Sequence, residues 1–326
     1  MVVVPIVISG AVAWAMGRLA LWVGPPIGIV DRPDDPDLKV HKRAAVPLGG
    51  IAILVALAVG SAVAGGFDAL LIPMAALVVA LGVVDDRASL SPALRLSAET
   101  GIAAMTIAAG LTPLRIEHPL EAVVGLGVIV VAINAVNLFD GLDALAGSAS
   151  FVAFVGLGAL AALRGLDFTL PLLIAGAIAG FLALNRPPAR LFLGDNGSYL
   201  LGFLLAIAVL RMSPRGVDVG LAIAGLALGV FLLDFSVTIL RRRISGRPLF
   251  TGDRSHLYDL LHDRGWAVGA IAVLAAAAET LFVVTGLVIE LFWVSWWAVV
   301  AVLLLCLALV VVLAWRSPSE LSGAAP

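Results

Sequence analysis

The chain has 326 residues, of which 62% are hydrophobic and only 13% are charged, and its mean hydropathy is +1.12. Soluble domains are about half apolar and about a quarter charged, so this composition excludes an ordinary soluble protein and indicates that lipid surrounds most of the chain. The formal net charge of −2 favours neither nucleic acid nor an acidic partner. The single cysteine, Cys306, lies in an apolar run, which excludes an intrachain disulfide and favours a buried structural role.

Apolar segments recur along the chain at lengths that suit membrane helices, for which about 17–25 residues are needed. The first segment begins without basic residues, so we interpret it as a membrane helix and not as a signal peptide. The predicted fold is therefore all-α: a polytopic membrane bundle in one domain over residues 1–316, with a short polar tail at 317–326. The eleven predicted helices are 2–24, 47–65, 69–84, 94–112, 120–137, 147–163, 169–185, 198–212, 217–240, 267–289 and 293–315.

The charges of the loops predict the orientation of the bundle. The loops and tail on one face hold fifteen Lys and Arg residues, whereas the opposite loops hold four. Basic loops stay in the cytoplasm, so we predict that the N-terminus is outside and the C-terminus is cytoplasmic. The long polar loops also lie on the predicted cytoplasmic face, which places the chemistry there.

Two adjacent acids, Asp85 and Asp86, end the predicted third helix, with Arg95 one loop further on. Carboxylates are disfavoured at a helix C-terminus by the helix dipole, and two together repel each other. This pattern indicates that the pair binds a metal or a protonated phosphate, with one carboxylate free to act as a base.

Four oxygen-bearing side chains, Asn134, Asn137, Asp140 and Asp143, recur every three residues at the end of the predicted fifth helix. On an unbroken helix they would form one narrow stripe, unless Gly141 ends the helix first. Carbonyl and carboxylate oxygens are the ligands that Mg²⁺ prefers, usually one or two of them together with substrate phosphate. The segment therefore predicts a magnesium site at the membrane boundary.

Two later loops carry further candidates. The sequence GDNGS predicts a tight turn that feeds a helix, with Ser198 as the N-cap and Asp195 just before it, where a cation and an anion could meet. In the last loop, the pair Arg254 and His256 suits a pyrophosphate group. Asp234 lies within a membrane segment, where an ionisable residue is a functional candidate, and we expect it to act through other site residues without contacting the substrate.

These loops, in this order and on one face, resemble the polyprenyl-phosphate N-acetylhexosamine-1-phosphate transferases over residues 31 to 265. The stretches NAVNLFDGLDALA and FLGDNGS carry the resemblance most strongly. It implies transfer of a sugar 1-phosphate from UDP-GlcNAc, or a related UDP-N-acetyl sugar, to undecaprenyl or another polyprenyl phosphate. UMP is released, and the reaction initiates a cell-surface glycan. The implied cofactor is Mg²⁺, with Mn²⁺ as an alternative.

The resemblance also implies roles for individual residues. Asn137 and Asp195 would bind the metal on the donor pyrophosphate. Asp85 and Asp86 would act on the lipid-phosphate side, where one removes the acceptor's proton, with Asp140 as a catalytic neighbour of the metal or phosphate.

Substrate contacts would come from the remaining matches. Asp143 would hydrogen-bond the uracil, Phe192 would stack on the base, and Arg254 and His256 would hold the pyrophosphate. Three other substrate-binding residues match at the first loop and near the acidic pair: Lys39, His41 and Arg95.

The chain departs from the family pattern at three places, the first of which is Leu38, where the first loop usually has Arg. Arg95 stands where Lys is usual, which keeps the charge but changes its geometry. The last loop reads His256-Leu257-Tyr258-Asp259 in place of a histidine cluster, which argues against the MurNAc-pentapeptide branch. The predicted topology of eleven helices with the N-terminus outside resembles the WecA-like branch.

The expected partners are the UDP-sugar, the polyprenyl phosphate and membrane lipids, in a bacterial-type inner membrane with the active site facing the cytoplasm. Nucleic acid is not expected, and homodimer formation is left open. Two alternatives compete with the transferase: an ion-coupled transporter, because membrane acids often mark ion pathways, and a catalytically inactive, scaffold-like paralogue, because the last loop is altered.

Overall fold

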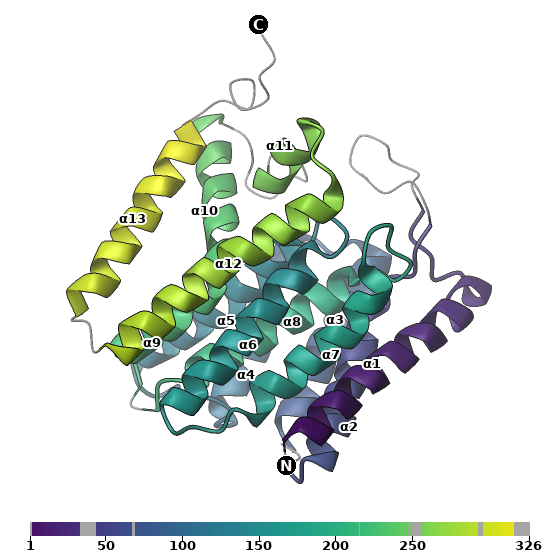
Figure 1. The fold of residues 1–326 in the computed structure, drawn as a ribbon, viewed down its shortest axis with the longest axis horizontal. Coiled ribbons are helices and arrows are strands. Elements are labelled where there is room, and N and C mark those ends of the chain that lie inside the picture. The colour runs from purple at the N-terminus through teal and green to yellow at the C-terminus, as the bar shows by residue number, and fades with distance from the viewer. Residues whose placement is uncertain are drawn as a thin grey trace, which may run out of the picture.

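The computed structural model describes residues 2–32, 44–66, 69–214, 216–246, 248, 256–292 and 296–315. Within these ranges the protein is a bundle of α-helices with two isolated β-bridges (Figure 1). Each of the eleven predicted segments coincides with a helix or, for the segment 217–240, with a broken pair. The helices are α1 (Val3–Val23), α2 (Gly49–Val63), α3 (Leu71–Ala88), α4 (Pro92–Ala108), α5 (Pro119–Phe139), α6 (Leu145–Leu163), α7 (Thr169–Asn185), α8 (Gly194–Arg211), α9 (Val219–Gly225), α10 (Gly229–Ile244), α11 (Leu257–Asp263), α12 (Val268–Leu291) and α13 (Trp296–Trp315).

Five helical spans in the described ranges are long and apolar enough to cross a membrane: α1, α5, α6, α12 and the broken helix formed by α9 and α10. Two shorter helices, α2 and α7, are also apolar. The predicted class, an all-helical polytopic membrane protein, is therefore confirmed. The number of crossings and the sides on which the termini lie stay predictions.

Helix α8 forms the centre of the bundle. Every residue from Asn196 to Leu210 is buried, because α8 is apolar on all sides and other helices surround it. It packs most extensively against α3 and α5. Since α3 and α5 end where α8 begins, three chain segments meet at one end of the bundle.

Helices α1 and α7 lie side by side along one flank of the bundle (Figure 1). They approach closely through glycines: a Cβ atom on Gly180 would overlap the backbone of Gly10. Small residues allow such backbone contact between membrane helices. This pairing brings the end of α1 next to the loop that follows α7.

The ninth predicted helix is broken inside the bundle. A 3₁₀ turn at Leu226–Leu228 separates α9 from α10. The first N–H groups of a new helix need acceptors, and Glu279 of α12 accepts a hydrogen bond from the N–H of Val230 at 2.9 Å. A buried carboxylate from another helix thus stabilises the new helix start.

Candidate active site

A cleft of about 1060 Å³ opens at the end of the bundle where α3 and α5 end and α8 begins. A smaller pocket of about 640 Å³ lies between α1 and the segment that follows α7. The cleft is lined by seven of the residues that the sequence singled out: Asp85, Asp86, Asn137, Asp140, Asp143, Phe192 and Asp195.

Asp86 caps the N-terminus of α8. Its Oδ1 accepts a hydrogen bond from the N–H of Asp195 at 2.9 Å, and its Oδ2 accepts from Asn196, from Nδ2 at 2.8 Å and from the N–H at 3.4 Å. A carboxylate at a helix N-terminus satisfies free N–H groups and offsets the helix dipole. The acid that ends α3 is therefore stabilised by the start of a different helix.

This arrangement corrects the predicted N-cap. Helix α8 begins at Gly194, so Ser198 lies inside the helix, where its hydroxyl accepts a hydrogen bond from Asn137 Nδ2 at 3.0 Å. The cap comes from Asp86, which is remote in sequence, and sequence proximity therefore pointed to the wrong residue.

Two glycines make the capping contact physically feasible. Gly50 of α2 and Gly82 of α3 both face the backbone of Asn196, and a Cβ atom on either would overlap it. Helices α2 and α3 can therefore approach the start of α8 closely enough for Asp86 to reach its N–H groups.

Asp85 has different surroundings from its neighbour. It is buried, whereas Asp86 is exposed to the cleft. Asp85 accepts hydrogen bonds from the hydroxyl of Tyr199 and, at 2.7 Å, from the N–H of Leu90. Arg95 Nη1 lies 3.8 Å from Asp85 Oδ2. Asp85 is thus engaged by protein groups.

Arg95 does not line the cleft. Its guanidinium lies between Asp85 and the buried Glu99, with Nε 3.8 Å from Glu99 Oε1. Asn134 also donates to Glu99. Arg95 and Asn134 therefore belong to a polar network behind Asp85.

The predicted stripe of four residues on α5 is wrong. The helix ends at Phe139, and Asp140 occupies the C-cap position with φ −83° and ψ 51°, just before Gly141. Only Asn134 and Asn137 lie on the helix, and Asn134 is bonded to Glu99. Asp140 and Asp143 reach the cleft from the turn that follows.

Asn137 and Asp195, the predicted metal ligands, are hydrogen-bonded to each other. Asn137 Nδ2 donates to Asp195 Oδ1 at 2.8 Å as well as to Ser198. These bonds occupy the amide nitrogen, so the Asn137 carbonyl oxygen and Asp195 Oδ2 stay available as ligands. Both are oxygen donors of the kind that Mg²⁺ prefers.

Acids predominate in the described lining of the cleft, where six aspartates face one arginine, Arg87. The Asp140 side chain accepts no hydrogen bond from the described residues, and its pKa is raised to about 8, first by removal from water and then by the charges of Asp195, Asp86 and Asp143. No group of three His, Cys, Asp or Glu side chains in the described ranges is arranged to hold a metal unaided. The residues therefore fit a Mg²⁺ ion that takes one or two protein oxygens and completes its shell with substrate phosphate.

The segment after α7 forms one wall of the cleft. Its backbone is tied to the turn after α5, because Asp143 Oδ2 accepts from the N–H of Ala189 at 2.8 Å. Asn185 ties the same two segments: its Oδ1 accepts from the N–H of Ala144 at 2.9 Å, and its Nδ2 donates to the carbonyl of Leu191 at 2.8 Å. Its role was not predicted.

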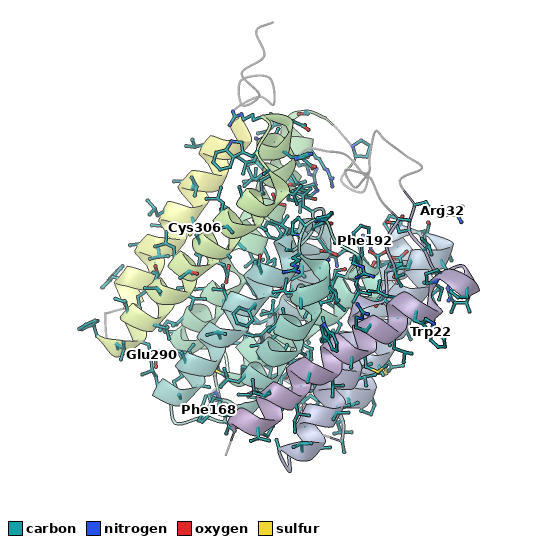
Figure 2. All side chains as sticks on the ribbon, turned by 45° about the vertical axis from the view of Figure 1, so that its right-hand side comes forward. Trp22, Arg32, Phe168, Phe192, Glu290 and Cys306 are labelled. Carbon is teal, nitrogen blue, oxygen red and sulfur yellow. The ribbon has the colours of Figure 1, made fainter. Side chains whose placement is uncertain are left out.

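Phe192 extends this wall. Its N–H donates to the carbonyl of Val46 at 2.9 Å, which fixes the backbone before α8. Figure 2 shows Phe192 at the same end of the molecule as Arg32, with Phe168 and Glu290 at the opposite end. One cleft wall thus combines an aromatic ring with the Asp143 carboxylate.

His256 and Asp234 form a buried pair outside the cleft lining. His256 Nδ1 lies 2.7 Å from Asp234 Oδ2, and Asp234 Oδ1 accepts from the N–H of Leu257 at 2.8 Å. Burial disfavours the charged imidazole, but the hydrogen bond and charge of Asp234 outweigh that effect and raise the pKa of His256 above 6.5. Asp234 therefore anchors His256 and the start of α11.

Helix α11 is fastened over the turn that carries Asp140. The His256 ring stacks on Tyr258, with ring centres 5.1 Å apart, and the Tyr258 hydroxyl donates to the carbonyl of Leu138 at 3.0 Å. Gly141 lies directly under Tyr258, where a Cβ atom would overlap the ring. His262, one turn further along α11, lines the cleft and was not predicted.

Three predicted substrate contacts, Lys39, His41 and Arg254, lie outside the described residues. Tyr199, which donates to Asp85, and Asn196, which donates to Asp86, were not assigned roles from the sequence. Asn196 directly follows Asp195, and Tyr199 lies one helical turn after it. The available signal was the polar run at the start of an otherwise apolar helix.

Comparison with known proteins agrees with this site. A family model described as glycosyl transferase family 4 matches residues 69–213, which span α3 to α8 and include most of the cleft. The chain is 26% identical over 254 residues to a probable undecaprenyl-phosphate N-acetylglucosaminyl 1-phosphate transferase of Bacillus subtilis, covering 72% of this chain and 70% of that protein.

Two further relatives show how the likeness is distributed. An undecaprenyl-phosphate alpha-N-acetylglucosaminyl 1-phosphate transferase of Thermotoga maritima is 28% identical over 239 residues, which are 70% of this chain and 71% of that protein. A phospho-N-acetylmuramoyl-pentapeptide-transferase of Symbiobacterium thermophilum is 35% identical over 115 residues, only 35% of this chain and 32% of that protein.

The fold is that of a polytopic membrane protein, and its cleft is lined by acids that fit a divalent cation. The chain is similar to glycosyl transferase family 4 over residues 69–213, a little less than half of its length. Within that family, the two long matches support the WecA-like branch, whereas the MurNAc-pentapeptide match is confined to about a third of each chain.

Proposed function

We propose that the protein transfers an N-acetylhexosamine 1-phosphate from a UDP-sugar to undecaprenyl phosphate, releasing UMP, at the cytoplasmic face of a bacterial inner membrane. The reaction would initiate a cell-surface glycan. The observation that carries the proposal is the convergence of Asn137, Asp195 and Asp86 at the start of α8. Oxygen ligands for a cation suit the pyrophosphate of such a donor, because Mg²⁺ binds through one or two protein oxygens together with substrate phosphate.

Asn137 and Asp195 would hold the Mg²⁺ ion, or Mn²⁺ in its place. When bound, the metal would neutralise charge on the donor pyrophosphate. Asn137 fixes the orientation of the Asp195 carboxylate through their hydrogen bond. Positioning and charge compensation account for most catalysis in phosphoryl transfer.

The reaction forms a bond between an oxygen of the lipid phosphate and the sugar-linked β-phosphorus, and it breaks the bond from that phosphorus to the oxygen that leaves with UMP. We infer a direct attack. Asp86 uses both oxygens to cap α8, and Asp85 is buried against Tyr199 and Leu90, so neither is presented as a nucleophile. Asp140 accepts no hydrogen bond from the described residues and has a pKa of about 8, which suits a proton acceptor for the lipid phosphate.

The uridine would bind along the wall that combines Phe192 and Asp143. Asp143 Oδ2 is occupied by the N–H of Ala189, which fixes the carboxylate and leaves Oδ1 to accept the uracil N–H. The Phe192 ring would stack on the base, since aromatic stacking is the usual way to hold a flat nucleobase.

An inactive, scaffold-like protein is the competing function, because His256 is buried against Asp234 and does not line the cleft. The transferase is favoured because seven of the predicted site residues line one cleft. His256 then has a positioning role through α11 and the turn that carries Asp140.

Release of UMP by the purified full-length protein tests the proposal, with undecaprenyl phosphate, Mg²⁺ and UDP-GlcNAc, followed by other UDP-N-acetyl sugars. We expect release that requires both lipid and metal and is lost in Asp195→Asn, but persists in Glu290→Gln, a carboxylate change outside the cleft lining. Silence with every donor, in protein that still binds UDP-sugar, would favour the inactive paralogue.

A further inference from the structure

Three arginines, Arg18, Arg186 and Arg190, line a second pocket of about 640 Å³. It lies where the end of α1 meets the segment that follows α7. The rest of its lining carries no acid: Trp14, Ala183, Leu184, Pro187 and Pro188. The pocket therefore combines strong positive charge with apolar walls.

Among the described residues, the three guanidinium groups have no acidic partner. No salt bridge within the described part of the chain involves them, and Arg18 instead lies over the Trp14 ring, 5.9 Å from its centre. All three arginines are exposed. Like charges gathered in one pocket repel each other, so the arrangement is stabilised when an anion binds there.

The pocket faces the surface that lipid would cover. Helix α1 buries only four of its residues, Pro5, Ser9, Ala13 and Gly17, and much of its remaining apolar surface is exposed, including Trp14 at 48% and Trp22 at 77%. Tryptophan and arginine near a helix end are typical of the membrane interface. The anions that a pocket at the membrane interface meets are lipid headgroups.

The pocket shares a wall with the cleft. Pro187 and Pro188 line both cavities. The next residue, Ala189, donates its N–H to Asp143, and the carbonyl of Arg190 accepts from the N–H of Val46 at 3.3 Å. One short segment therefore carries the arginines on one side and positions a cleft carboxylate on the other.

We propose that this pocket binds the phosphate headgroup of an anionic membrane phospholipid, and that the bound headgroup braces segment 186–190 and thereby the nucleotide wall of the cleft. Basic pockets between membrane helices are typical binding sites for such headgroups. The binding claim is independent of the proposed function, whereas the effect on the cleft rests on it.

Native mass spectrometry of the full-length protein in detergent tests binding directly, with phosphatidylglycerol as the probe and phosphatidylcholine as the neutral reference. We expect the triple variant R18Q/R186Q/R190Q to lose about a hundredfold in affinity for phosphatidylglycerol, since each cation near an anionic headgroup contributes about fivefold. Phosphatidylcholine binding should not change. The matched control R115Q/R243Q/R264Q removes equal charge at other exposed positions and should retain phosphatidylglycerol binding. Equal losses in the two triple variants would overturn the proposal.

Competition separates the sources of the anion. Inorganic phosphate or UMP should not displace phosphatidylglycerol at comparable concentration, because a soluble anion lacks the acyl chains. Displacement by either soluble anion would refute a phospholipid site. The site would also be refuted if R18Q/R186Q/R190Q lost undecaprenyl phosphate binding but kept phosphatidylglycerol binding.

A separate assay tests the coupling to the cleft. UMP release by wild-type protein should be higher in phosphatidylglycerol nanodiscs than in phosphatidylcholine nanodiscs, and the triple variant should lose this increase. If binding is lost but the increase persists, the coupling is wrong while the transferase assignment stands.

Discussion

The two ends of the helical bundle use their charged residues in opposite ways. At the end away from the cleft, Arg164 pairs with Glu290 through two bonds, 2.6 Å and 3.0 Å long, and donates to the carbonyls of Met212 and Gly220. Asp218 at the same end caps α9 through the N–H of Leu221. These charges are satisfied by the protein and connect the segments around α6, α8, α9 and α12.

At the cleft end, several aspartate side chains line one cleft. Asp140 accepts no hydrogen bond from the described residues, and its pKa is raised first by removal from water and then by the charges of Asp195, Asp86 and Asp143. Natural sites often sacrifice stability to hold a ligand. The comparison suggests that charge at the far end stabilises the fold, whereas charge at the cleft end is retained for a metal and phosphates.

The largest effect is expected from Asp86→Asn. The amide retains an oxygen that can accept from the start of α8, so folding should persist, but the negative charge is lost. Loss of one positioned electrostatic group typically lowers kcat by about 10²–10³-fold. UMP release and thermal unfolding measured on the same preparation check this. Asp167→Asn, an exposed acid next to α7, should leave both unchanged, and a large drop in Tm with normal turnover in Asp86→Asn would reverse the assignment of the two ends.

Arg164→Gln should lower stability and leave activity unchanged. It breaks the pair with Glu290 and removes the donor for two carbonyls, so the free energy of unfolding should fall by about 2 kcal/mol, as for a hydrogen-bonded charged group. Activity per folded molecule should not change. A double-mutant cycle with Glu290→Gln measures the coupling of the pair. Loss of turnover without loss of stability would show that the far end contributes to catalysis.

Magnesium affinity should depend on Asp140. Its pKa of about 8 means that protons compete with the cation, so the Mg²⁺ concentration for half-maximal activity should rise as the pH falls below about 8. For one proton displaced, the change approaches tenfold per pH unit. Asp140→Asn should flatten this dependence. Titrations of wild type and variant against pH provide the comparison, and parallel curves would exclude Asp140 from the metal's surroundings.

The smallest effect is expected from Asp234→Asn. Because Asp234 raises the pKa of His256 above 6.5, the pair stabilises the fold fully below that pH and less as the pH rises through the raised value. The wild type should therefore exceed Asp234→Asn in stability by about 1 kcal/mol at acidic pH, and the gap should shrink with increasing pH. Unfolding measured as a function of pH tests this. A gap that widens toward alkaline pH would mean that His256 is neutral in the pair.

Local patterns were enough to predict most helices and the chemical character of the cleft. Long apolar runs required membrane-type helices, and the polar loops at one end contained Asn137, Asp195, Asp143 and Phe192, all of which line the cleft. The helices could be predicted because hydrophobicity is a property of neighbouring residues, whereas the roles of the residues in the cleft stay predictions.

The sequence could not predict the partners that come from distant segments. Asp86 caps a helix that begins 108 residues later, at Gly194, and Tyr199 engages Asp85 across 114 positions. The break before α10 is stabilised by Glu279 of α12. The end of α5 at Phe139 depended on whether Gly141 stopped the helix, and Tyr258 packs where that glycine leaves space. Each outcome is decided by tertiary contacts.

Thermal unfolding with and without Mg²⁺ and UDP-GlcNAc tests the division between the two ends most directly. A ligand that binds only the folded state adds about 2.7 kcal/mol at a hundred times its Kd. We predict that Mg²⁺ and UDP-GlcNAc together raise the Tm of wild type and of Arg164→Gln by the same amount, although Arg164→Gln starts lower, and that Asp195→Asn gains little. An equal gain in Asp195→Asn, or a gain lost in Arg164→Gln alone, would contradict the account.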